Sequence, residues 1–170
     1  MLCLGILWNS VQEYKDMAIE DIQKYGSLIG TFDMPLEENY EAFVRDIYAQ
    51  DEIATWKVDK KVETMFNSSD VRTVTVVFIE VDLTDQFYHG GKNKMVYTNL
   101  ENLKTGIRDK YGKMIKDYFF DNVFHMTDDE LELKADLTVV SNYLKNMSMQ
   151  SSNNGIQLIK RINNTQKNND

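Results

Sequence analysis

Hydrophobic positions along the chain form short runs, and between these runs they recur every three or four residues. The runs are rich in apolar, β-branched and aromatic side chains, a composition typical of β-strands. The only proline, Pro35, closes the second run, as a strand end would require. The pattern therefore predicts four strands, at residues 4–8, 27–34, 71–82 and 119–125.

The segments between these runs each show a single apolar stripe with helical spacing. We expect an α+β fold, namely a ferredoxin-like four-stranded antiparallel sheet with helices mainly on one face. The alternative is a doubly wound parallel sheet, which is disfavoured because the chain lacks a glycine-rich turn between a strand and a helix. The predicted helices lie near residues 11–25, 37–48, 56–66, 100–112 and 128–144, and residues 83–95 are predicted to form a polar loop.

The composition changes near residue 147, where serine, asparagine, glutamine and lysine become frequent. Few apolar side chains remain there to offset the entropy lost when a backbone becomes ordered. We therefore predict one α+β domain at residues 1–147. Residues 148–170 are expected to form a polar, mobile tail, with a helical turn near residues 156–162.

Charge and cysteine content narrow the classes of protein to consider. The net charge of −8 argues against a nucleic-acid or anionic-membrane binder, because such proteins carry basic faces. Cys3 is the only cysteine, so the chain cannot form a disulfide within itself. No run approaches the roughly 20 apolar residues of a transmembrane helix. We expect a cytoplasmic protein without nucleic-acid or membrane partners, and homo-oligomerisation stays open.

One of the two histidines, His125, is placed where chemistry is favoured. It ends an apolar strand and precedes an acidic helix start, so an imidazole at this point lies at the rim of the core. Asp136 follows about two helical turns into the next helix, where its carboxylate would orient one ring nitrogen and leave the other as a nucleophile. His89 lies in the predicted loop without a cysteine or histidine cluster, so no metal site is expected.

Lys104 and Arg108 are four residues apart on one predicted helix and therefore lie on the same face. Such a pair can hold a phosphate, because the guanidinium group makes bidentate contacts with oxyanions. The alternative is an ordinary solvated helix face, which the spacing alone favours.

The segment Asn122-Val123-Phe124-His125-Met126-Thr127-Asp128 resembles the Asn-x-x-His-Gly-Ser-Asp signature of nucleoside diphosphate kinases. That family is also ferredoxin-like, and the order of elements is similar over residues 4–145. The resemblance implies that His125 is the phosphoryl acceptor, and that Asp136 orients its ring through Thr127. The specific motif match covers residues 122–136.

The same resemblance implies a substrate site and a cofactor. The substrate would be a nucleotide or another small phosphorylated molecule, with Mg²⁺ accompanying a nucleoside triphosphate. The family's first-strand lysine is missing, because Trp8-Asn9-Ser10 stands at that place, and Lys57, Lys60 or Lys61 are candidates to replace it. The residues expected to bind substrate or phosphate are Asn122, Arg108, Lys104 and Tyr48.

Two functional hypotheses follow. In the first, the chain is a divergent phosphotransferase of the nucleoside diphosphate kinase type that forms a phosphohistidine. In the second, it is a non-catalytic binding or regulatory module that keeps the fold and a phosphate-sized pocket. Whether the chain is an enzyme stays open at this point. The hypotheses depend on whether the imidazole of His125 opens onto a cleft lined by Lys104 and Arg108.

Overall fold

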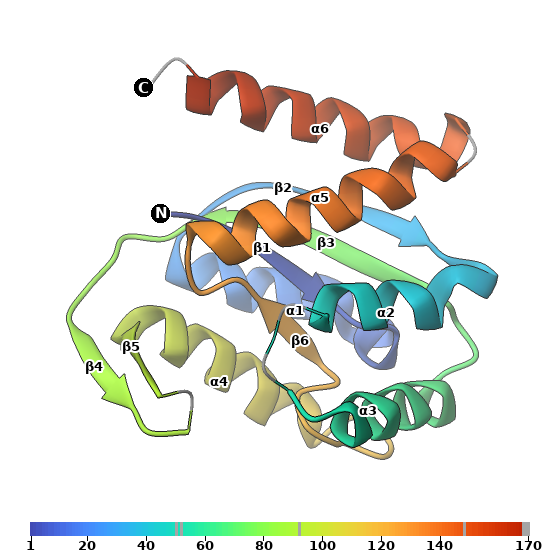
Figure 1. The fold of residues 1–170 in the computed structure, drawn as a ribbon, viewed down its shortest axis with the longest axis horizontal. Helices are drawn as coiled ribbons and strands as arrows, with labels where there is room; N and C mark the ends of the chain where they lie inside the picture. The colour runs from blue at the N-terminus through green and yellow to red at the C-terminus, as the bar shows by residue number, and fades with distance from the viewer. Residues whose placement is uncertain (50, 52, 92, 148, 168–170) are drawn as a thin grey trace.

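The computed structural model describes residues 1–49, 51, 53–91, 93–147 and 149–167 (Figure 1). Short 3₁₀ segments at Asn9–Tyr14, Gln23–Tyr25 and Glu37–Asn39 extend the helices that they adjoin. In chain order, the strands and helices are β1 (Leu2–Leu7), α1 (Lys15–Ile22), β2 (Ser27–Pro35), α2 (Tyr40–Tyr48), α3 (Thr55–Ser68), β3 (Thr73–Glu80), β4 (Gln86–His89), β5 (Lys94–Tyr97), α4 (Thr98–Gly112), β6 (Phe124–Met126), α5 (Glu130–Asn146) and α6 (Met149–Lys167).

The main sheet has four strands in the order β2-β3-β1-β6. Every neighbouring pair in it is antiparallel, with Leu4 opposite Phe78 in β3 and Ile6 opposite His125 in β6. The fold is therefore α+β with a four-stranded antiparallel sheet, as the sequence predicts, and the parallel alternative is wrong. This register places His125 at the edge of the sheet, beside the central strand β1.

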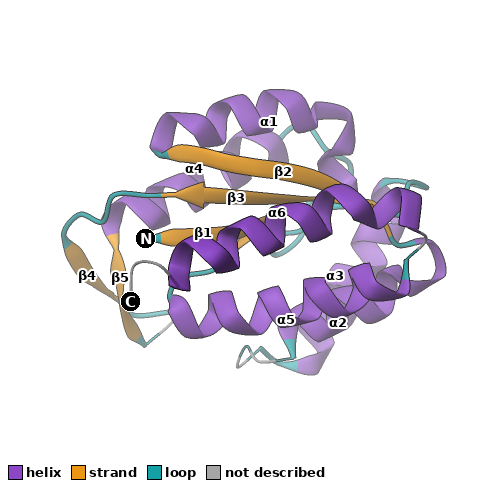
Figure 2. Ribbon diagram, turned by 90° about the horizontal axis from the view of Figure 1, so that it is seen from above, coloured by secondary structure: helices purple, strands orange, loops and turns teal. Residues whose placement is uncertain are grey.

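Strand β1 is buried on both faces, and this explains its continuous apolar run. Leu4 and Ile6 point into one hydrophobic core, and Cys3 and Leu7 point into another on the opposite face. Strand β3 follows the same alternation, with side chains in both cores. The sheet is thus the middle layer of three, and helices cover each face (Figure 2).

The helices lie mainly on one face of the sheet, as predicted, and two of them cover the other face. Helices α2, α3, α5 and α6 contribute to the core that contains Leu4, while α1 and α4 cover the face that contains Leu7. The single apolar stripe of each helix shows that one side of the helix is buried. The stripe does not show against which face of the sheet the helix packs. The apolar run Leu4-Gly5-Ile6-Leu7-Trp8 is the signal for a second covered face.

The region before His125 differs from the predicted long strand. Strand β6 covers only Phe124–Met126, because the residues before it turn. Asp117, Phe120 and Asp121 have positive φ angles of 56°, 38° and 60°, a conformation incompatible with a strand. The predicted polar loop at 83–95 also differs, because it contains the β4–β5 hairpin.

Residues Met149–Lys167 form helix α6, where the sequence predicts a mobile tail. Residues 148 and 168–170 of the predicted tail lie outside the described residues. Ile159 and Ile162 recur on one face and enter the core between α5 and β2. Two glycines permit this close approach: a Cβ atom on Gly30 would lie 2.9 Å from Leu158, and one on Gly155 would lie 2.8 Å from Phe32. A few apolar residues at helical spacing are enough to dock the helix, although the average composition is polar.

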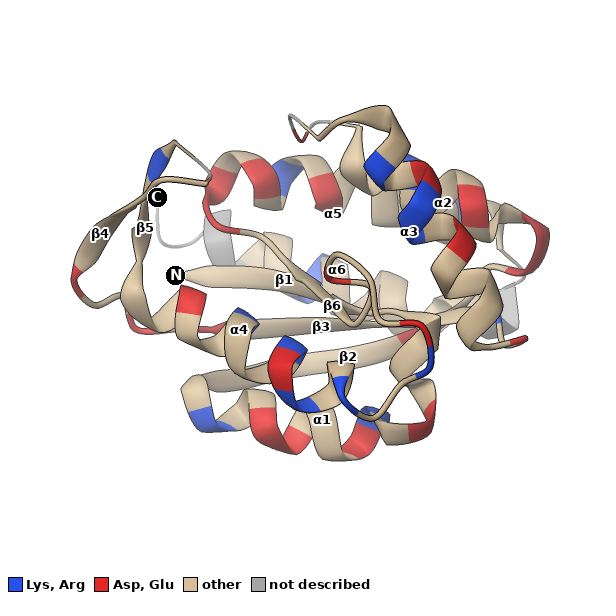
Figure 3. Ribbon diagram, turned by 90° about the horizontal axis from the view of Figure 1, so that it is seen from below, with Lys and Arg blue, Asp and Glu red and all other residues tan. Residues whose placement is uncertain are grey.

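The surface carries both signs of charge. Acidic and basic residues are interspersed over the helices on the side that Figure 3 shows. Among the described residues, no helix has the length and apolar character needed to span a bilayer.

Candidate functional site

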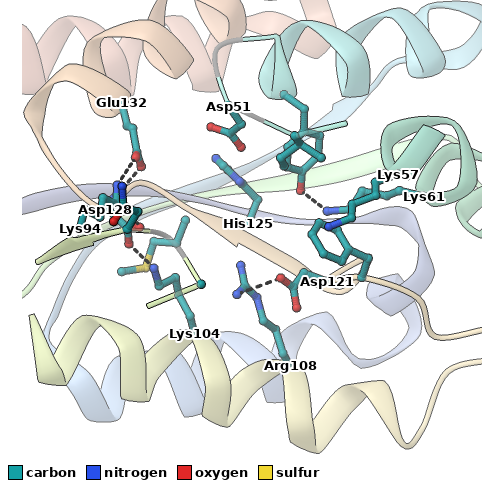
Figure 4. A pocket seen from close by; sticks show the side chains of 16 residues that line it. Asp51, Lys57, Lys61, Lys94, Lys104, Arg108, Asp121, His125, Asp128 and Glu132 are labelled. Carbon is teal, nitrogen blue, oxygen red and sulfur yellow. Dashed lines mark hydrogen bonds and ion pairs between the residues drawn. The ribbon is translucent and has the colours of Figure 1, made fainter. Parts of the chain in front are cut away.

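A cavity of about 530 Å³ lies beside β6, between α3, α4, the start of α5 and the β4–β5 hairpin (Figure 4). Its lining combines charged side chains from several elements with a few apolar ones. The lining residues are Tyr48, Asp51, Ile53, Lys57, Lys61, Gly91, Asn93, Lys94, Lys104, Arg108, Phe120, Asp121, His125, Met126, Asp128 and Glu132.

The imidazole of His125 lines this cavity and is held by Asp136. Its Nε2–H donates to Oδ2 of Asp136 at 2.7 Å, and the two side chains are almost fully buried. Asp136 reaches the ring from the second turn of α5, as the sequence spacing predicts. With Nε2 bound to a carboxylate, the lone pair of a neutral imidazole is on Nδ1, and no described residue forms a hydrogen bond to that atom. The arrangement presents a nucleophilic nitrogen beside the cavity.

Two aromatic rings pack against the imidazole of His125. The Tyr48 ring lies edge-on to the imidazole with centroids 5.4 Å apart, and the Trp8 ring lies at 6.5 Å. Tyr48 ends α2 and is almost fully buried. Trp8 is fully buried and is therefore part of the apolar support for the ring.

Lys104 and Arg108 both line the cavity, but each is paired with acidic groups. Lys104 contacts the carboxylate of Asp128, and its Nζ lies 3.1 Å from Oε2 of Glu101. Arg108 donates from Nε to the backbone oxygen of Phe124 at 2.9 Å. Its Nη1 lies 3.1 Å from Oδ2 of Asp121. These pairs tie α4 to the segments on either side of β6.

Helix α3 supplies two further cations. Lys57 and Lys61 line the cavity, whereas Lys60 pairs with Glu63 on the exposed surface. The Nζ of Lys61 donates to the Tyr48 hydroxyl at 2.7 Å. Of the three lysines considered as replacements for the missing first-strand cation, two therefore reach the site.

Asn122 and Thr127 do not line the cavity, contrary to the roles inferred for them. Asn122 is fully buried, and its Nδ2 donates to Oγ1 of Thr64 and to the backbone oxygen of Asp117. Thr127 is also fully buried, and its Oγ1 accepts from the backbone N–H of Leu4. Asn122 therefore organises the turn before β6, and Thr127 ties β6 to β1. Asp136 orients His125 by direct contact.

Several lining residues carry no signal in the sequence. Asp51 follows α2, and burial raises the pKa of its carboxyl, an effect that nearby His125 opposes. Phe120 enters the cavity from the turn with positive φ angles. Lys94, from β5, pairs with Glu132 at 2.7 Å. Only the tertiary fold brings these loop and hairpin residues to His125.

In the part of the chain that the structure describes, no group of three or more histidine, cysteine or acidic side chains is arranged to hold a metal. His89 lies outside the cavity lining, with its Nε2 at 3.8 Å from Glu101.

Neither a scan against family models nor a search of curated proteins finds a match to this chain.

Proposed function

We propose that the protein is a divergent phosphotransferase of the nucleoside diphosphate kinase type, with His125 as the phosphoryl acceptor. One observation carries the proposal. The imidazole of His125, held through Nε2 by Asp136, lies in the wall of a cavity that is also lined by lysine and arginine side chains. The Asn-x-x-His signature and the antiparallel α+β fold support the same assignment.

In the proposed reaction, the lone pair of Nδ1 attacks the terminal phosphorus of a bound nucleoside triphosphate. A nitrogen–phosphorus bond forms, the bond from that phosphorus to its bridging oxygen breaks, and the diphosphate leaves with the electron pair. The carboxylate of Asp136 stabilises the positive charge that develops on the ring. Transfer to a terminal phosphate oxygen of a second acceptor reverses these changes and restores neutral His125.

The cavity volume is within the range of small-molecule sites, about 300–1,000 Å³. Magnesium enters the proposal as an ion bound to the phosphates of the nucleotide, because Mg²⁺ commonly uses substrate phosphates with one or two carboxylates. When bound, the ion would neutralise phosphate charge beside carboxylates such as Asp51 and Asp121.

A second candidate function is a non-catalytic module that binds a small, weakly charged ligand. The observation that favours it is the charge balance of the lining, since the described residues supply five basic and four acidic side chains. Lys94, Lys104 and Arg108 each pair with a carboxylate of the same lining. A site so balanced attracts a polyphosphate less than an unpaired cluster of cations would.

Incubation with a nucleoside triphosphate labelled at its terminal phosphate, with magnesium, separates these functions. The phosphotransferase should give an acid-labile, alkali-stable phosphoprotein. His125→Asn should abolish labelling, because asparagine has no nucleophilic nitrogen. Asp136→Asn should slow labelling by about tenfold or more, since the ring loses its carboxylate.

His89→Asn is the matched control, because it removes the other histidine, which does not line the cavity, and it should leave labelling unchanged. A phosphoprotein that persists in His125→Asn would contradict the proposal. Ligand binding without labelling of the wild-type protein would favour the non-catalytic module.

A further inference from the structure

Lys61 differs from the other basic residues of the cavity in its partners. It is 2% exposed, and its Nζ bonds to the hydroxyl oxygen of Tyr48. The same Nζ lies 3.9 Å from the centroid of the Tyr48 ring and 5.4 Å from that of Phe120. Among the described residues, no carboxylate lies within 4.0 Å of this amine. Within the described part of the chain, this buried amine thus has two aromatic neighbours and no carboxylate at ion-pair distance.

Such a group is costly to charge, because burial removes water without supplying an anion. Burial lowers the pKa of Lys61 to about 7. The more distant carboxylates of Asp121 and Asp51 oppose this effect, and Arg108 adds to it. An anion placed next to the amine would supply the counter-ion that the fold does not.

Tyr48 strengthens the case for a ligand at this point. Its hydroxyl oxygen accepts from Lys61, so its own hydrogen remains to be donated. No described residue accepts that hydrogen, although Tyr48 lines the cavity. The amine and the phenol therefore form an adjacent pair of donors, which matches the needs of an oxyanion.

We propose that Lys61 is the residue that binds an oxyanion in this cavity, and that it takes up a proton when the anion binds. Its helix neighbour Lys57, four residues earlier and also over the Phe120 ring, adds a second positive charge. In the phosphotransferase, the oxyanion would be a phosphate of the nucleotide, and that identity rests on the proposed function. The binding of an oxyanion and the uptake of a proton by Lys61 do not depend on the proposed function.

Binding and protonation are linked, so the affinity must depend on pH. If only the charged amine binds, a lysine with a pKa of about 7 predicts a roughly 30-fold weaker affinity at pH 8.5 than at pH 6.0. Other groups facing the same space also affect the anion. The charged or titratable neighbours are Tyr48 from α2, Asp51 after it, Lys57 on α3, Arg108 on α4, Asp121 before β6, and His125 on β6.

The probe is sulfate, which mimics phosphate but neither titrates in this pH range nor transfers a phosphoryl group. The measurement is the NMR titration of isotope-labelled lysine side chains, in wild-type protein and in His125→Asn, where the histidine cannot contribute. One lysine should titrate near pH 7 and be missing from the spectrum of Lys61→Met. Saturating sulfate should raise its pKa by about one pH unit or more.

Lys61→Met should abolish sulfate binding, whereas the matched control Lys60→Met, on the exposed surface of the same helix, should leave it unchanged. A Lys61 resonance that titrates near 10, or sulfate binding that survives in Lys61→Met, would overturn the inference. The wild-type titration decides the matter even if Lys61→Met fails to fold. If no phosphohistidine forms but pH-dependent sulfate binding is intact, the phosphotransferase proposal is rejected. The inference on Lys61 then still stands.

Discussion

The two helices that border the cavity carry similar pairs of basic residues with opposite surroundings. Lys104 and Arg108 on α4 and Lys57 and Lys61 on α3 are each spaced by four residues. On the α4 side, both side chains meet carboxylates. On the α3 side, the described residues place no carboxylate within ion-pair distance of either lysine, and the neighbours are aromatic rings.

Spacing along a helix identifies a basic face of that helix but does not show whether the face binds a ligand or stabilises the fold. Glu101 is a partner on α4 itself, whereas Asp121 and Asp128 come from the segments just before and just after β6. Because of these ion pairs, Lys104 and Arg108 have a framework role, which means that they hold α4 to the segments around β6. The α3 lysines have no carboxylate partner among the described residues, so their amines are available to a ligand.

The largest expected effect tests the framework role of α4. Lys104→Ala should lower the free energy of unfolding by about 3–5 kcal/mol, because Asp128 and Glu101 lose a buried cation. Urea denaturation at pH 7 measures the change. Lys113→Ala, on the exposed surface just after α4, should change the value by less than about 0.5 kcal/mol. A loss below about 1 kcal/mol in Lys104→Ala would mean that the pair is dispensable.

The second effect concerns the α3 side and depends on pH. The unfolded chain holds the lysine proton up to a pKa of about 10.4, whereas the folded chain releases the Lys61 proton near 7. Between these values the unfolded state binds more protons, so the stability contributed by this site rises with pH. Relative to Lys61→Met, the wild-type protein should gain about 2–3 kcal/mol between pH 6 and pH 9.

Urea denaturation of both proteins at pH 6, 7.5 and 9 measures this difference. Lys60→Met, with its exposed side chain, should follow the wild-type profile throughout. Parallel profiles for wild type and Lys61→Met would show that the buried amine does not titrate in this range.

The smallest expected change is in sulfate affinity, when Arg108 on α4 is left without its carboxylate partner and so resembles the lysines on α3. Asp121→Asn removes the carboxylate that pairs with Arg108, and asparagine tolerates the positive φ of this position. Sulfate affinity at pH 6, where Lys61 is charged, should rise about three- to tenfold. NMR titration measures it, and Asp59→Asn, which removes a carboxylate from the exposed pair with Arg45, is the control. Unchanged affinity in Asp121→Asn would mean that Arg108 faces no bound anion.

The arrangement of strands and helices was largely predictable, because each strand and helix carries its own hydrophobic period. The four-stranded antiparallel sheet is confirmed, and the predicted helices match α1 to α5 to within a few residues. The errors lie where local pattern conflicts with tertiary contacts. Docking of α6 depends on two isoleucines and two glycines, whose effect is hidden in a polar average composition.

The candidate site was predictable in part. His125 and Asp136 meet because a strand end and the second turn of the following helix are close by geometry. Tyr48, Lys104 and Arg108 also reach the cavity. The sequence could not show that carboxylates pair with the α4 cations, since those contacts depend on loop conformations. Asn122 and Thr127 have hydrogen-bond partners in segments far away along the chain, which a local motif does not reveal.

The position of β1 in the sheet has a consequence for how the chain folds during synthesis. This strand pairs with β3 and β6, whose residues follow it by roughly 70 and 120 positions. At translation rates of about 5–20 residues per second, β1 would wait on the order of ten seconds for its last neighbour. Both of its faces are apolar, so part of this apolar surface stays uncovered until β6 and the later helices are synthesised. Pairing of strands far apart in the sequence also favours slow folding.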